Sequence, residues 1–108
     1  MRIYIAGPLS ATFQRDMYKN AERAIDTGLK LIQMGHFPFI PHMTAFLPSP
    51  FGITSEEWLA WGLEWLRQCD AILYLGPSPG ADAELKLAQE LGLEVFYRAE
   101  DVPDASSG

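Results

Sequence analysis

Glu84 is the residue of this sequence whose type and spacing most clearly suggest chemistry. It follows a glycine- and proline-rich turn at residues 76–80. It lies four residues beyond Gly80, so the two would share one face of a helix, whereas Asp82 would point elsewhere. The same face continues with apolar residues, Leu87, Ala88 and Leu91. We therefore expect the carboxylate of Glu84 to point inward, where a carboxylate without a partner is costly.

A hydroxyl donor for this carboxylate could come from Tyr4, which lies in a predicted strand just before Gly7. A carboxylate held beside such a donor can attack an anomeric carbon, and the resulting glycosyl-enzyme ester then breaks down with water or another acceptor. Glu84 is thus a candidate nucleophile and Tyr4 is its candidate partner. The alternative is purely structural, because the helix dipole alone favours an acid near the start of a helix.

Candidate binding residues surround this pair in two glycine-containing turns. Gly7 and Gly80 would let a ligand approach the backbone, and the free N–H groups at a helix start favour an anion. Ser78 could either cap the helix or contact the ligand. The candidate substrate-binding residues are Gly7, Pro8, Leu9, Ser78, Gly80 and His42.

The two histidines, His36 and His42, give no support for a metal site. They have no cysteine pair nearby, so we expect no metal ligation. His42 follows the second predicted strand and could reach a substrate, although a packed or solvent-facing histidine is the commoner arrangement. Dinucleotide and triphosphate motifs are missing from the sequence, and we expect no cofactor.

The hydrophobic pattern predicts alternating strands and helices. In chain order they are a strand over 2–6, a helix over 13–34, a strand over 36–40, a loop over 42–53, a helix from Thr54, a strand over 70–75, a helix over 79–91 and a strand over 93–97. Such alternation predicts an α/β domain of three layers, with a parallel sheet of about four strands between helices on both faces. With the first strand central, the turns after the first and third strands meet at the switch point where ligands bind such sheets. We expect one domain over 1–98 and a flexible polar tail over 99–108.

Two stretches are more apolar than their predicted structure requires. The loop over 42–53 carries Met43, Phe46, Leu47 and Phe51, so it either packs back onto the core or forms a pocket wall or a subunit contact. The following helix begins with a Thr54–Glu57 capping box. Its broad apolar face, with three tryptophans, suggests cover by the sheet on one side and by a partner subunit on the other.

Composition excludes several classes of protein. The chain has 108 residues and a net charge of −6, and its basic residues form no cluster, so a polynucleotide partner is not expected. There is no apolar run long enough to span a membrane and no signal-peptide pattern at Met1–Tyr4, so we expect a cytoplasmic protein without membrane contact. The single cysteine, Cys69, cannot form an internal disulfide.

Several segments together resemble the nucleoside 2-deoxyribosyltransferase superfamily, and most closely its branch labelled domain of unknown function 4406. The resemblance covers about residues 1–97 and rests on Ile3-Tyr4-Ile5-Ala6-Gly7-Pro8-Leu9, Asn20, Ala24, Gly35-His36, Pro38, Pro41, Trp65-Leu66-Arg67-Gln68-Cys69-Asp70-Ala71 and Ser78-Pro79-Gly80-Ala81-Asp82-Ala83-Glu84.

This resemblance implies a flavodoxin-like fold and chemistry at the N-glycosidic bond of nucleosides or nucleotides, either cleavage or transfer. By the same resemblance Glu84 is the nucleophile, Tyr4 orients it, and Ser78 helps to bind a nucleotide. It also implies homodimers or higher homo-oligomers with sites near the subunit contact.

One departure from the superfamily leaves a second function open. Gly62 stands where the nucleotide-hydrolase branch carries an acid, and the carboxylates that could substitute are Glu57, Glu64 and Asp70. The missing acid favours the alternative function, a non-catalytic sensor or accessory module that binds a nucleotide or sugar phosphate in the same pocket.

Overall fold

The computed structural model describes residues 1–47 and 52–105 of the chain. Its elements are β1 (Arg2–Ala6), α1 (Gln14–Gln33), β2 (Phe37–Phe39), the 3₁₀ helix η1 (Pro41–Phe46), α2 (Ser55–Leu66), β3 (Ala71–Tyr74), α3 (Pro79–Glu90), β4 (Glu94–Phe96) and the 3₁₀ helix η2 (Ala99–Asp101).

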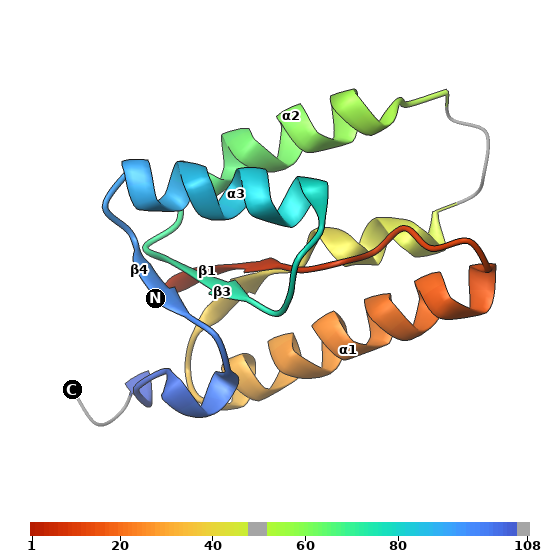
Figure 1. The fold of residues 1–108 in the computed structure, drawn as a ribbon. Coiled ribbons are helices and arrows are strands. Elements are labelled where there is room, and N and C mark those ends of the chain that lie inside the picture. Colours follow the sequence, from red (N-terminus) through yellow and green to blue (C-terminus); the bar gives the residue numbers. More distant parts are fainter. Residues whose placement is uncertain (48–51, 106–108) are drawn as a thin grey trace.

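The strands form one parallel sheet in the order β2-β1-β3-β4, which confirms the predicted topology. Figure 1 shows α1 and η2 on one face of the sheet and α2 with α3 on the other, so the three-layer, flavodoxin-like arrangement is also confirmed. Strand β1 is central and, beyond its first residue, fully buried, as expected for a strand covered on both faces. Because every crossover helix returns antiparallel to the strands, α2 and α3 both begin at the carboxyl edge of the sheet.

Helix α1 packs unusually close to the sheet at Gly28. A Cβ atom at this position would overlap the side chain of Ile40 and lie 3.4 Å from Cδ1 of Ile5. This packing explains why the helix tolerates a residue that costs about 1 kcal/mol relative to alanine. The helix ends at Gln33, shortly before the predicted stop at Gly35, whose φ of +89° is the left-handed conformation that glycine adopts most easily.

The predicted loop over 42–53 is partly wrong, because Pro41–Phe46 forms η1. Its apolar residues Met43, Phe46 and Leu47 are exposed, whereas the polar His42 is buried. Residues 48–51, including Phe51, lie outside the described part of the chain.

The predicted flexible tail is wrong for residues 99–105. Ala99 and Val102 are three residues apart, so one 3₁₀ turn places both against the core formed by Ile3, Ile5 and Leu31. The Ala105 N–H donates to the carbonyl of Met34 at 2.9 Å, which fastens the segment to the end of α1. Two apolar residues among polar neighbours are too weak a pattern to reveal this packing. Residues 106–108 lie outside the described part of the chain.

None of the helices found within residues 1–47 and 52–105 has the length and apolar character needed to cross a membrane.

Candidate active site

A cavity of about 510 Å³ lies where the carboxyl ends of β1, β2 and β3 meet the first turns of α2 and α3. Its wall comes from five segments: Tyr4, Gly7, Leu9 and Ser10; Pro41, His42 and Thr44; Ser55, Glu56, Trp58, Leu59 and Trp61; Ser78, Pro79, Gly80 and Ala81; and Glu84. This is the predicted switch point, and the two glycine-containing turns meet there as the strand order requires.

Tyr4 and Glu84 meet in this cavity, and the predicted contact between them is confirmed. The Tyr4 hydroxyl donates a hydrogen bond to Oε2 of Glu84. Tyr4 is completely buried on the central strand, and its ring stacks on Phe39 with 5.4 Å between ring centroids. The tyrosine is therefore a donor that the central strand and Phe39 hold in place. The acceptor, Glu84, lies in the second turn of α3.

Glu84 is a buried carboxylate without a cationic partner in the described part of the chain. Only 8% of its surface is exposed. Burial raises the pKa of Glu84 to about 7, although the hydrogen bond from Tyr4 acts in the opposite direction. Burial, and then the charge of Glu84, raises the pKa of Tyr4, so the phenol keeps its proton and remains a donor. The pKa of this carboxyl group thus lies in the neutral range, where a general acid or base works, and the group would have to be ionised to act as a nucleophile.

Ser78 and Gly80 lie where they were predicted, at the start of α3 and in the cavity wall. Oγ of Ser78 caps the helix by accepting the Ala81 N–H at 3.0 Å. A hydroxyl that accepts one hydrogen bond can still donate another, so Ser78 can serve both as a cap and as a ligand contact. At Gly80 a Cβ atom would find no side chain closer than 4.0 Å, so the space beside it belongs to the cavity.

Gly7, Leu9 and His42 line the cavity, but Pro8 does not. Pro8 instead lies beside Gly76. A Cβ atom added at Gly76 would lie 3.7 Å from Cδ of Pro8. The prediction that Pro8 binds substrate is therefore not supported by its position.

His42 is both packed and part of the wall, with 3% of its surface exposed. Its Nε2 lies 3.0 Å from the carbonyl oxygen of Gly7, which can only accept, so Nε2 carries the proton. Burial lowers the pKa of His42, so the ring is neutral and Nδ1 is a bare acceptor. Nδ1 has no hydrogen-bond partner in the part of the chain that the structure describes.

The first two turns of α2 complete the cavity, and sequence reasoning missed this role. Trp58 and Trp61 meet edge to face at 5.4 Å, and Trp61 lies 5.2 Å from Phe39, so an aromatic cluster extends to Tyr4. The signal was available in the Thr54–Glu57 capping box, because a helix that begins after a parallel strand begins at the ligand-binding edge of the sheet.

The three carboxylates that could replace the missing acid at position 62 all lie outside the cavity wall. Glu57 accepts the Thr54 N–H at 3.0 Å as part of the capping box. Glu64 is exposed and lies 3.9 Å from Arg67. Asp70 accepts the Arg2 N–H at 2.8 Å, at the amino end of β1. Among the described residues, the one other acid in the wall besides Glu84 is Glu56.

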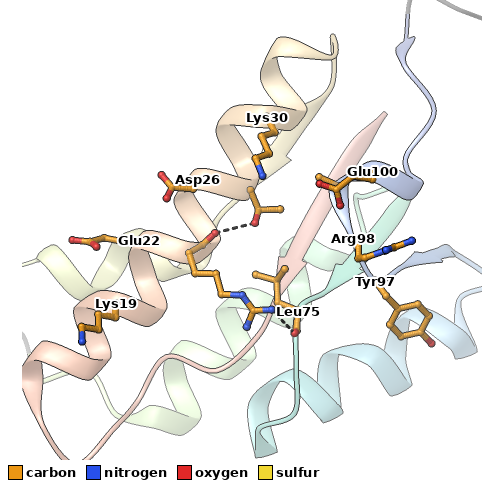
Figure 2. A pocket seen from close by; sticks show the side chains of 11 residues that line it. Lys19, Glu22, Asp26, Lys30, Leu75, Tyr97, Arg98 and Glu100 are labelled. Carbon is orange, nitrogen blue, oxygen red and sulfur yellow. Dashed lines mark hydrogen bonds between the residues drawn. The ribbon is translucent and has the colours of Figure 1, made fainter.

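A second hollow of about 500 Å³ lies on the opposite face of the sheet, between α1 and the segment after β4 (Figure 2). Charged side chains of both signs line it, namely Lys19, Glu22, Arg23, Asp26, Lys30, Arg98 and Glu100. Arg23 reaches across it and donates to the carbonyl of Leu75 at 3.0 Å. None of the predicted site residues lies there, and its acids are not buried. We therefore place the candidate active site in the cavity that contains Glu84.

In the described part of the chain there is no group of three histidine, cysteine or acidic residues that could hold a metal ion.

Residues 1–98 match the model of the family described as Domain of unknown function (DUF7768), and the chain belongs to this family. No curated protein matches the chain. Nothing in this match links the chain to the nucleoside 2-deoxyribosyltransferase superfamily, so the resemblance to that superfamily stays a prediction based on the sequence motifs.

Proposed function

We propose that this DUF7768 protein cleaves or transfers the N-glycosidic bond of a nucleoside or nucleotide, with Glu84 as the nucleophile. The observation that carries the proposal is a buried carboxylate, in the wall of a cavity, that is paired with a neutral tyrosine rather than with a cation. A cation would neutralise the carboxylate, whereas a tyrosine orients one oxygen and leaves the negative charge available for attack.

The reaction proceeds in two displacements at the anomeric carbon. An oxygen of ionised Glu84 forms a bond to C1′ while the bond from C1′ to the base nitrogen breaks, and the base departs with the bonding electrons and takes up a proton from solvent. Water then attacks C1′ of the glycosyl ester, loses a proton and restores the carboxylate. If a second base attacks instead, the product is a new nucleoside.

The cavity wall matches the parts of such a substrate. The aromatic cluster of Trp58 and Trp61 offers a surface on which a planar base can stack. The start of α3 offers the hydroxyl of Ser78 and the N–H of Gly80 to the sugar or to a phosphate. We expect no cofactor, because the reaction needs only the carboxylate and water.

The direct test measures free base by chromatography after incubation with a panel of deoxynucleosides and their 5′-monophosphates. Glu84→Gln keeps the size and polarity of the side chain but removes the nucleophile, so we expect base release to slow by on the order of a thousandfold or more. For the wild type, mass spectrometry of the acid-quenched protein should find the sugar attached to the peptide that contains Glu84. The assignment is wrong if Glu84→Gln releases base as fast as the wild type.

A non-catalytic module that binds a nucleotide or sugar phosphate is the second candidate. It is favoured by the positions of Glu57, Glu64 and Asp70, none of which brings a further carboxylate to the cavity. Such a module would gain thermal stability with a nucleotide, show no turnover, and keep the same gain in Glu84→Gln. Loss of the gain in Glu84→Gln, or release of base by the wild type, would argue against it.

A further inference from the structure

Gly62 lies on the buried face of α2, directly opposite the Tyr4–Glu84 pair. A Cβ atom at this position would overlap the hydroxyl oxygen of Tyr4, and it would lie 3.5 Å from Oε2 of Glu84 and 3.6 Å from Cζ of Tyr4. The volume that a side chain would occupy at position 62 is therefore the volume that the tyrosine hydroxyl occupies.

The surrounding packing leaves no space into which the Tyr4 ring could move if position 62 carried a side chain. Tyr4 is completely buried on the central strand of the sheet, and its ring stacks on Phe39. Phe39 in turn contacts Trp61 and Trp65, which flank Gly62 on α2. Since close-packed interiors do not absorb an added carbon atom without a shift, a methyl group at 62 must displace the hydroxyl or the helix.

We infer that Gly62 is a positioning residue, whose missing side chain leaves the space in which the Tyr4 hydroxyl reaches and orients Glu84. The catalytic part of this inference rests on the proposed function, but the geometric part does not. In this chain a carboxylate at position 62 does not fit beside the Tyr4–Glu84 pair, so the site is built around a hydroxyl donor at this point instead of a second acid.

The test is a double-mutant cycle with Gly62→Ala and Tyr4→Phe. Its first readout is the titration of Glu84, followed by NMR of the carboxyl carbon in protein with labelled glutamate. Its second readout is the rate of base release at pH 7. Gly62→Ala should raise the titration midpoint of Glu84 above its value of about 7, because the hydrogen bond that favours the ionised form is broken. It should also slow base release about tenfold, the usual effect of losing a hydrogen bond to a charged group.

The double variant separates positioning from a general packing defect. Tyr4→Phe removes the oxygen that the added methyl group would overlap, and the remaining separation of 3.6 Å from Cζ is an ordinary contact. Adding Gly62→Ala to Tyr4→Phe should therefore leave the titration of Glu84 and the rate unchanged. The double variant should also melt at a higher temperature than Tyr4→Phe alone, because alanine is the better helix former.

Ala60→Ser is the matched control, because Ala60 is exposed two residues away on the same helix and its change should not move the titration. The inference is overturned if Gly62→Ala titrates like the wild type, or if its effect is equally large with and without Tyr4→Phe. If Gly62→Ala does not fold, the comparison of the double variant with Tyr4→Phe decides, and a further loss of stability there overturns the inference. If the titrations follow the expectation while the wild type releases no base, Gly62 still positions the pair and the proposed function fails.

Discussion

Two tyrosine–carboxylate hydrogen bonds join the sheet to α3, and they differ in their access to water. Tyr4 of β1 donates to Glu84, and Tyr74 at the end of β3 donates to Oδ1 of Asp82 at 2.7 Å. The two acids are separated by a single residue on the same helix, so they point in different directions. Glu84 faces the cavity and is buried, whereas Asp82 is exposed.

The same hydrogen bond thus has different consequences at the two places. Burial raises the pKa of Glu84 to about 7, against the effect of its own hydrogen bond. At the exposed pair, the hydrogen bond to Asp82 raises the pKa of Tyr74. A carboxylate–tyrosine pair therefore does not by itself make a reactive group. Removal from water at the wall of a cavity raises the pKa of Glu84, and for this reason we propose Glu84, and not Asp82, as the nucleophile.

The largest expected effect is on catalysis. Glu84→Gln should lower the rate of base release by on the order of a thousandfold or more, the usual cost of removing a nucleophile. Asp82→Asn makes the matching change on the exposed pair and should alter the rate by less than about twofold, in keeping with a surface substitution. Rates from single-turnover assays on both variants check this. An equal loss in the two variants would mean that α3 as a whole, and not Glu84, supports the reaction.

The next effect is on the pH dependence of stability. The pKa of Glu84 is raised in the folded state above its ordinary value, so its contribution to stability is fully present below about pH 4.5 and is lost as the pH rises towards about 7. The wild type should thus lose about 3 kcal/mol relative to Glu84→Gln between these pH values and nothing more above them. Urea unfolding of both proteins between pH 4.5 and 8 measures the difference. Parallel curves for the wild type and Glu84→Gln would contradict a buried carboxylate.

A smaller effect should separate the two tyrosines. Tyr4→Phe removes the donor to Glu84 and should lower kcat/KM at pH 7 about tenfold. The pH at which the rate rises should move above about 7, because the proton is then harder to remove from Glu84. Tyr74→Phe removes a half-exposed donor and should leave both kcat/KM and its dependence on pH unchanged. Identical profiles for Tyr4→Phe and the wild type would show that the hydroxyl does not act on the carboxylate.

Much of this arrangement could be predicted from the sequence, because it follows from local rules. The alternation of strands and helices determines the parallel sheet, and the strand order brings the turns after β1 and β3 together. Helical spacing separates Glu84 from Asp82, and strand adjacency supplies Tyr4. The residues that were predicted correctly are those whose positions follow from periodicity and topology alone.

The residues that were missed depend on tertiary packing. Ala99 and Val102 join the core through a single 3₁₀ turn, too short to leave a periodic pattern. The wall residues Trp58 and Trp61 were correctly predicted to be helical, but their apolar character could not show which part of the face closes a cavity. The need for glycine at position 62 follows only from the short distance between α2 and the Tyr4 side chain of β1. No local sequence pattern contains this distance.

The smallest effect distinguishes the two roles of a helix cap. Ser78 accepts the Ala81 N–H at the start of α3, and Thr54 accepts the Glu57 N–H at 3.1 Å at the start of α2. Ser78→Ala and Thr54→Ala should each lower the free energy of unfolding by about 1 kcal/mol, because each leaves one N–H without its cap. Only Ser78 lines the cavity, so only Ser78→Ala should also raise KM, whereas kcat should change little in both.

Equal changes of KM in the two cap variants would mean that Ser78 acts on binding only through the helix. Asp82 lies in the first turn of α3, which frays first when the cap is lost, while Glu84 lies two residues further along, in the second turn, and is held by Tyr4. Loss of the cap should therefore loosen the exposed Tyr74–Asp82 bond before it reaches Glu84. A raised KM with an unchanged titration of Glu84 would then assign the change to the lost hydroxyl of Ser78 itself.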